Sequence, residues 1–436
     1  MHPRRAIHPA LIAILFEGFL SRLSFGIISF VLPLYAYRRL GLSLSSAGLL
    51  LSFNLIAEQS FKPLMGWVAD RWGLRPTFTT AIALRSVVAL LFIFAFAPWQ
   101  IFAIRFLHGF SESMRDPSVN ALIAEFSHSK GIASSYAWYN TAKLTAGASG
   151  KALGGLVLAF SGENYQMAFA ASFALSILPL YVVSRYVRGP ETRSKLLSAT
   201  SAIVSGDGTA ESRERPQASS RQIIVPIAML GFLVCSTAHL IQGLFPIIAT
   251  EYAHLSVSQT ASIYAISVAV VLISGPVFGW VADHVSRQAV LMIRGLANSI
   301  SSLLYWFAPG MAGFTIGTLA DSIGKAAFRP AWGSLMATVA NIDRKKRAQT
   351  MSWLGVGEGL GETLGPLMGG LLWQFWGLPA LLGTRLALAI GAEIYSLQVN
   401  KKVKSLSSTN TRGETDAHLF SDGTTPQSEL SHIPGS

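Results

Sequence analysis

Long apolar segments recur along almost the whole of this chain, separated by short polar or charged loops. The apolar core of a bilayer is ~30 Å thick and a helix crosses it with roughly 20 residues. A chain of 436 residues built in this way has room for about twelve such spans. Only 13% of the residues are charged and 39 are glycine, a combination that is unusual in a soluble protein of this length. The sequence therefore predicts an all-α membrane protein.

The apolar windows, bounded by charges or by Gly/Pro clusters, fall into two groups of six. We expect the first group of helices at residues 9–37, 44–65, 77–97, 99–124, 134–160 and 165–187. We expect the second group at residues 223–249, 256–279, 288–308, 311–340, 350–374 and 379–399. The chain is thus predicted to fold as two six-helix bundles, residues 1–187 and 223–400.

Residues 188–222, between the predicted bundles, are polar, Ser-rich and basic at both ends, as is typical of a flexible linker. The tail, residues 401–436, has a similar composition, and we expect it to be flexible. Lys and Arg concentrate at residues 1–5, at 70–75, in the linker, at 343–347 and at 401–404. By the positive-inside rule, both termini and the linker are predicted to be cytoplasmic. Arg38 and Arg39 are exceptions on the outer side.

The basic residues that give the chain a net charge of +12 lie in short loops between apolar segments, so we expect no nucleic-acid partner. The single Cys235 lies in an apolar segment and provides neither a disulfide framework nor a thiolate metal site. The sequence contains no GxxxxGK[ST] loop and no nucleophile elbow. We therefore expect no cofactor, no metal, no ATP-driven pumping and no enzymatic turnover.

An internal repeat is visible in the sequence itself. GWVAD occurs at 66–70 and again at 279–283, a spacing of 213 residues. Three proline pairs keep this register: Pro33 with Pro246, Pro63 with Pro276, and Pro117 with Pro330. Because repeats of six spans run in the same direction, the halves are predicted to be parallel copies related by an axis along the membrane normal. Transporters favour this architecture, in which the solute site lies between the two copies.

The segment GWVADRWGLRP at 66–76 resembles the signature loop between the second and third helices of the major facilitator superfamily. The matching positions are Gly66, Asp70, Arg71, Gly73 and Arg75, and the second copy keeps Gly279 and Asp283. The resemblance covers the chain except for the linker and the tail. It implies secondary transport by a twelve-helix protein, with a loop that locks the cytoplasmic side when the carrier opens outward.

Two further motifs resemble the drug/metabolite:proton antiporters of that superfamily. RFLHGFSES, with Arg105 and Gly109, is similar to the Arg-x-x-x-Gly motif of proton-coupled members. GETLGPLMGG at 361–370 has the form of the glycine-proline motif that antiporters carry in their fifth helix. In this chain the motif lies in the eleventh predicted helix, and the fifth has Lys151 where the proline belongs.

Many charged residues fall inside predicted membrane helices. A charged side chain at the bilayer centre costs roughly 3 kcal/mol, so such residues persist where they are paired, face a cavity or have a function. They recur at spacings of three and four, which places them on single helix faces. The residues that we expect to line the solute path or to form salt-bridge latches are Arg22, Glu58, Arg105, His108, Arg115, Asp116, Lys143, Lys151, Asp321, Lys325, Arg329, Glu358 and Glu362.

In the repeat register these charges invert between the halves. His108 corresponds to Asp321, Glu112 to Lys325 and Asp116 to Arg329. Lys143 corresponds to Glu358 at a spacing of 215, which also relates GASGKALGGL at 147–156 to ETLGPLMGGL at 362–371. We expect such pairs to form salt bridges across the interface and to latch a two-state transporter. The alternative is that the charges pair within each half, as Glu58 and Lys62 can at i, i+4.

Glu17 and Glu112 are the predicted proton-coupling residues. A buried carboxylate beside a cation changes its proton affinity when a solute disturbs the pair. His108 and His239 are secondary candidates. Arg85, Arg385 and Glu393 lie on helices that are peripheral in the family, and we expect them to snorkel or to pair locally.

The favoured function is proton-coupled export of a small polar or charged organic solute by a monomer in a lipid bilayer. One alternative is an importer or facilitator of a zwitterionic or anionic nutrient or of a metal chelate. Another is a non-transporting receptor or scaffold, against which the retained signature loop argues. The sequence shows no eukaryotic sorting signal, so we expect a bacterial inner membrane.

Overall fold

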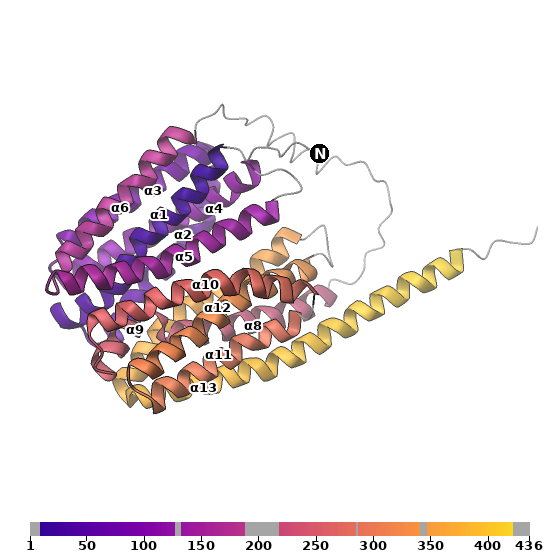
Figure 1. The fold of residues 1–436 in the computed structure, drawn as a ribbon. Helices are drawn as coiled ribbons and strands as arrows, with labels where there is room; N and C mark the ends of the chain where they lie inside the picture. The colour runs from indigo at the N-terminus through magenta and orange to yellow at the C-terminus, as the bar shows by residue number, and fades with distance from the viewer. Residues whose placement is uncertain (1–8, 127–131, 188–217, 285–286, 341–346, 422–436) are drawn as a thin grey trace, which may run out of the picture.

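The computed structural model describes residues 9–126, 132–187, 218–284, 287–340 and 347–421, which are helical apart from short turns (Figure 1). The first half consists of α1 (Pro9–Leu34) with the π-helical turn η1 (Tyr35–Arg39), α2 (Leu44–Trp72), α3 (Leu74–Ile93), α4 (Pro98–Phe126), α5 (Ile132–Phe160) and α6 (Tyr165–Tyr186). The second half consists of α8 (Ala218–Gln242) with α9 (Phe245–Ile247) and η2 (Ile248–Tyr252), α10 (Val257–His284), α11 (Arg287–Phe307), α12 (Met311–Ala340) and α13 (Arg347–Ser421).

α13 contains two predicted spans joined at Gly377. This residue has φ 79° and ψ 171°, a conformation that breaks the helix and that glycine adopts without a Cβ clash. With α13 counted as two spans, each half has six, and the predicted twelve-helix fold is confirmed. Figure 1 shows the α1–α6 and α8–α13 groups lying beside each other.

Several boundaries differ from the prediction, and three of them concern the linker, the tail and the signature segment. α8 begins at Ala218, five residues before the predicted start at 223, and residues 188–217 of the predicted linker lie outside the described residues. α13 continues to Ser421, into the segment expected to be flexible, because 401–421 contains no proline to stop the helix. α2 continues beyond its predicted end at residue 65 to Trp72, within the signature segment, and the next residue, Gly73, has a φ of 100° that does not continue the helix.

Seven helices among the described residues are long and apolar enough to cross a membrane, and the two joined spans of α13 count as one of them. The helices that fall short of this criterion are α2, α4, α5 and α12. These four carry most of the charged residues picked out from the sequence. Because charges inside a span are tolerated where they face the protein interior, these helices are expected to surround the functional site.

The repeat is visible in the backbone. Pro33 and Pro246 each precede a π-helical turn, at Tyr35–Arg39 and Ile248–Tyr252 respectively. These turns are 213 residues apart, which is the spacing of the sequence repeat. The two halves therefore share a detail of backbone geometry as well as a sequence motif.

Among the described residues, the two halves share a hydrophobic core at one end of the bundle. We call this the Arg38 end, and the opposite end, where α2 meets α3, the Gly73 end. Near the Arg38 end, one buried cluster combines first-half residues such as Phe30 and Leu51 with second-half residues such as Leu244 and Tyr264. Toward the Gly73 end the clusters are separate: one contains residues of α8 and α11–α13 only, and the others contain first-half residues only. The halves are thus joined at one end and have independent cores at the other.

We predict that Gly150→Ala lowers the stability of the first half, because α1 and α5 pack backbone to backbone at this position. A Cβ on Gly150 would meet the carbonyl oxygen of Leu23 and lie 2.8 Å from the Cα of Gly26. Overpacking of this kind costs about 1–3 kcal/mol. The measurement is the thermal unfolding midpoint of the purified protein in detergent. The control is Gly391→Ala, where a Cβ meets nothing within 4 Å; equal midpoints for the two variants would contradict the prediction.

Candidate functional site

Glu17 and Arg115 form a fully buried ion pair between α1 and α4. Nη2 of Arg115 lies 2.8 Å from Oε2 and 3.0 Å from Oε1 of Glu17, and Nε donates to Oε1 at 3.1 Å. The same Nη2 donates to the hydroxyl of Tyr139 on α5 at 2.8 Å. The side chains of Glu17 and Arg115 are 0% and 2% exposed. This two-pronged contact ties three helices of the first half together.

Glu112 is paired with Arg85 of α3, which donates to Oε1 of the carboxylate. Arg85 also donates to the carbonyl oxygen of Ser21 at 3.1 Å, and Nε2 of His108 lies 3.6 Å from Oε1 of Glu112. Of the two expectations for Arg85, snorkelling or local pairing, the structure shows local pairing within the first half. Arg85 is buried, and it contacts α4 through Glu112 and α1 through the carbonyl of Ser21.

The ring of Phe25 on α1 gathers several cations around it. It stacks on the imidazole of His108 with ring centroids 4.3 Å apart and planes 7° from parallel. The guanidinium groups of Arg85, Arg22 and Arg105 lie 5.1, 5.7 and 5.9 Å from its centroid. Such cation–π contacts offset part of the repulsion between neighbouring cations. Phe25 was not predicted from the sequence, although it lies three residues from Arg22 and therefore on the same helix face.

A second chain of ion pairs joins α2 to α4. Nζ of Lys62 lies 3.3 Å from Oε1 of Glu58 and 3.5 Å from Oδ2 of Asp116, and Oδ1 of Asp116 lies 3.7 Å from Nη1 of Arg115. Arg105 instead donates to oxygen atoms of α2, namely Oδ1 of Asn54 and the carbonyls of Leu50 and Leu51. In this state, the arginine of the Arg-x-x-x-Gly motif fixes α4 against α2.

Asp321 is the centre of the buried network in the second half. Its carboxylate lies 2.7 Å from Nζ of Lys325, 3.1 Å from Nη1 of Arg294 and 3.2 Å from Nη2 of Arg385. Arg385 is 0% exposed. It also donates to the carbonyl of Thr237, to Asn298, and to the hydroxyls of Ser301 and Ser302. Of the two expectations for Arg385, snorkelling or local pairing, the structure shows local pairing with Asp321 of the same half. Arg294 was not named as a site residue from the sequence. Its charge inside the apolar segment 288–308 was the signal that could have identified it.

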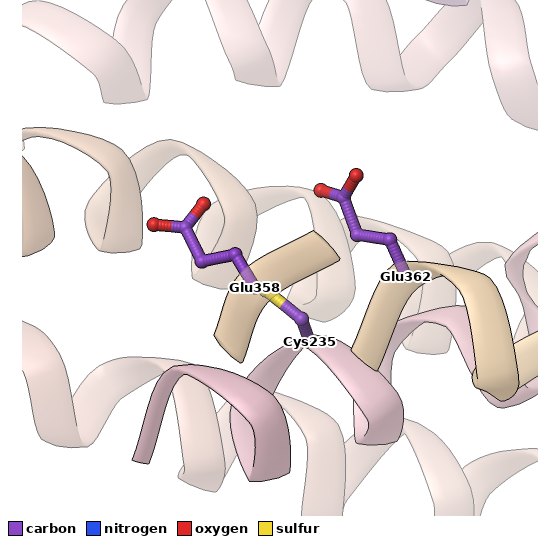
Figure 2. Close-up of side chains that lie close together, drawn as sticks. All are labelled: Cys235, Glu358 and Glu362. Carbon is purple, nitrogen blue, oxygen red and sulfur yellow. The ribbon is translucent and has the colours of Figure 1, made fainter. Parts of the chain in front are cut away.

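Glu358 and Glu362 lie one turn apart on α13, and Figure 2 shows their carboxylates pointing to the same side. Arg329 of α12 lies 3.6 Å from Oε2 of Glu358 and 3.7 Å from Oε1 of Glu362, and Trp332 Nε1 donates to Glu358. Sγ of Cys235 on α8 and a carboxylate oxygen of each glutamate lie within 4.8 Å of one another. A thiol beside two carboxylates was not expected from the sequence. Arg329 provides a counter-charge for both carboxylates.

Arg22, Lys143 and Lys151 form no ion pair in the part of the chain that the structure describes. Each lies against an aromatic ring instead. The ammonium of Lys143 is 5.3 Å from the ring centroid of Tyr139, and that of Lys151 is 5.0 Å from Tyr264 of α10. Lys151 thus lies where α5 meets the other half.

None of the cross-interface pairs predicted from the repeat register is formed among the described residues. Eight residues were expected to form these pairs, namely His108, Glu112, Asp116, Lys143, Asp321, Lys325, Arg329 and Glu358. Seven of them have an ionic partner in their own half, and Lys143 has none among the described residues. Arginines from α3 and α11 occupy the carboxylates of α4 and α12, which the prediction did not consider. In this state the alternative, pairing within each half, describes the interior.

An ion pair between repeat-related residues does occur at the Arg38 end. Nε of Arg38 lies 2.7 Å from Oε1 of Glu251, and its Nη1 lies 3.2 Å from Oε1 of Glu163. Arg38 and Glu251 are 213 residues apart, so they are equivalent positions of the two halves. Two more contacts cross the same end: the amide of Leu44 donates to Gln374, and that of Leu367 donates to Ser52.

The signature segment lies at the Gly73 end. Arg71 lies over the ring of Trp67, and Arg75 pairs with Glu125 of α4 at 3.5 Å. Gly66 lies within α2. Asp70, Gly279 and Asp283 lie outside the residues whose side chains the structure describes. Trp67 and Glu125 both belong to the first half, so these contacts hold the segment against its own bundle.

A twelve-helix bundle with charged side chains on its internal faces defines a multi-pass membrane transport protein. The sequence profile of the Major Facilitator Superfamily matches residues 14–311 and 227–415. The chain belongs to this superfamily. The uncharacterized MFS-type transporter YttB of Bacillus subtilis is 24% identical over 392 residues, 88% of this chain and 94% of that protein. The multidrug resistance protein MdtH of Photorhabdus laumondii is 24% identical over 369 residues, 83% of this chain and 86% of that protein.

Solved structures share the fold. The nucleoside transporter NupG superposes with a TM-score of 0.69 at 14% identity, covering 90% of this chain and 99% of that one. A bacterial homologue of the human lysosomal transporter Spinster, in an inward-facing and occupied conformation, superposes with a TM-score of 0.68 at 15% identity. This second match covers 90% of this chain and 96% of that one. At these identities the similarity concerns the fold alone.

We predict that Arg38→Gln favours separation of the halves at the Arg38 end. A partly exposed ion pair contributes up to about 1 kcal/mol, so its loss shifts a two-state equilibrium up to about fivefold. The measurement is the distribution of distances between two spin labels, obtained by double electron–electron resonance. The labels are attached at Met167→Cys and Ser258→Cys in a Cys235→Ser background. The fraction of long distances should increase.

Two variants control this experiment. Arg39→Gln removes a neighbouring exposed charge and should leave the distances unchanged. The exchanged pair, Arg38→Glu with Glu251→Arg, forms the bridge between the halves again but loses the contact with Glu163, so it should restore the original distribution in part. An unchanged distribution in Arg38→Gln would show that the pair does not hold the halves together.

Proposed function

We propose that the chain is a proton-coupled secondary transporter that exports a small polar or charged organic solute by alternating access. The observation that carries the proposal is the asymmetry of the cores. The halves share a core at the Arg38 end and have separate cores at the Gly73 end, with charged helix faces along the interior. Such an arrangement suits rocking of two rigid halves around a central site.

The proposed orientation places the Gly73 end in the cytoplasm. Basic residues concentrate at 70–75 and 343–347, and both segments belong to that end in the predicted topology. This conformation is then the inward-facing one. The relatives are bacterial, which supports a bacterial inner membrane, and MdtH is named a multidrug resistance protein, which supports export.

Glu17 and Glu112 remain the proposed coupling carboxylates. Each is buried and paired with one arginine, Glu17 with Arg115 and Glu112 with Arg85. Protonation of a carboxylate removes the attraction that holds its arginine, and helices fixed by that contact can then move. The cross-interface latches expected from the repeat are proposed for the outward-facing state only, in which the Gly73 ends would approach each other.

The test is proton flux in liposomes that contain the purified protein and a pH-sensitive dye. The solutes are ethidium as an organic cation, benzoate as an organic anion and a dipeptide as a zwitterion. We expect at least one to drive proton movement, and Glu112→Gln to reduce that movement about tenfold or more, because amides do not titrate in this range. Solute exchange in the absence of a proton gradient should persist in Glu112→Gln.

Glu393→Gln is the matched control. It also neutralises a carboxylate within a membrane helix, but Glu393 accepts a hydrogen bond from the amide of Gly295, which the Gln carbonyl can still accept. Its proton flux should remain at the wild-type level. Solute uptake without proton movement in every variant would overturn the coupling and leave a facilitator.

A further inference from the structure

Four cations inside the first half form no ion pair in the described part of the chain. One of them, Arg105, is satisfied by oxygen atoms of α2, and the other three are Arg22, Lys143 and Lys151. The first-half carboxylates of the interior network, Glu17, Glu58, Glu112 and Asp116, are already paired with other cations. Arg22, Lys143 and Lys151 have only aromatic rings as close partners. Because an isolated charge is costly away from water, such groups are retained where they face a hydrated path or a ligand.

Two of these cations share a face of α5, and the third, Arg22 of α1, lies against that face. Lys143, Gly147 and Lys151 follow each other at intervals of four residues and therefore share a face of α5. A Cβ on Gly147 would lie 3.6 Å from Cγ and 3.9 Å from Nε of Arg22. The Arg22 side chain thus crosses α5 at the turn between the two lysines, with its charged end beside this face.

The other half adds to the positive charge at this place. Lys151 lies against Tyr264 of α10, and α10 packs against α12, which carries Lys325. The carboxylate of Asp321 is already shared by three cations. A surplus of positive charge therefore remains at the interface of the two halves.

We propose that Arg22, Lys143 and Lys151 bind an oxyanion group of the solute, such as a phosphate or a carboxylate. The guanidinium of Arg22 supplies a planar pair of donors and the lysines supply charge from either side. The inference rests on the proposed transport function, because it takes the interface to be the solute path. It goes further by assigning an anionic class of solute to the site.

The experiment is isothermal titration calorimetry of the purified full-length protein in detergent, with inorganic phosphate as the probe. Chloride replaces phosphate in the reference titration at the same ionic strength, and tetraethylammonium chloride serves as a cationic probe. We expect saturable phosphate binding and none of the cation. Arg22→Gln or Lys151→Gln should weaken phosphate binding about tenfold, as expected for the loss of one charge-assisted hydrogen bond.

Two variants make the result specific. Lys151→Arg keeps the charge and should bind within about threefold of the wild type, which is less than 1 kcal/mol. Arg39→Gln removes a charge from an exposed position outside the membrane interior and should have no effect. Thermal unfolding of each variant shows whether it is folded.

Three results would overturn the inference: no saturable phosphate binding by the wild type, unchanged binding in both Gln variants, or equal weakening in Arg39→Gln. Failure of the anion site is distinguishable from failure of the proposed function. Proton-coupled movement of ethidium without phosphate binding would sink the anion site and leave the transporter. Phosphate binding without any solute-dependent flux would overturn the proposed proton-coupled transport and leave the anion site.

Discussion

The difference between buried and exposed ion pairs governs how this molecule can move. Breaking a buried pair by removing one partner costs about 3–5 kcal/mol, whereas an exposed pair contributes up to about 1 kcal/mol. The buried pairs, such as Glu17–Arg115 and Arg294–Asp321, lie within one half, and Arg38–Glu251 crosses between the halves with about a third of its side chains exposed. The strong contacts therefore lie within each half, and the weak one lies where the proposed rocking would separate the halves.

The fold was predictable because apolar segments bounded by charged residues, glycine or proline directly indicate membrane-spanning helices. Apolar windows located all twelve helices, and the repeat of 213 residues reappears in the positions of η1 and η2. The errors fell at element ends, where composition is ambiguous. The polar tail after residue 400 resembles a linker in composition, yet without proline its first part extends α13.

The partners of the charged residues were not predictable in the same way. Sequence spacing places a side chain on a face of its helix but does not say which neighbouring helix that face meets. In the repeat register Glu112 corresponds to Lys325 and Arg85 to Asn298, but the second half forms its pair with Asp321 and Arg294. Asp321 lies four residues before Lys325, and Arg294 lies four residues before Asn298. An ion pair thus joins α11 to α12 as one joins α3 to α4, but it is formed by residues at other positions of the repeat. Comparing equivalent positions therefore produced pairs that the structure does not form.

Charges that maintain the structure differ in their partners from charges that are free to act on a solute. Arg85, Arg115 and Arg385 are satisfied by their own half, so a solute that displaced their partners would have to replace contacts that already exist. When Arg22, Lys143 or Lys151 binds a solute, the side chain loses only its contact with the face of an aromatic ring, which is worth about 0.5–2 kcal/mol. A negative group arriving between the halves gains most at these three positions. Lys151 lies against Tyr264 of the other half, so an anion bound there would also act on a contact between the two halves.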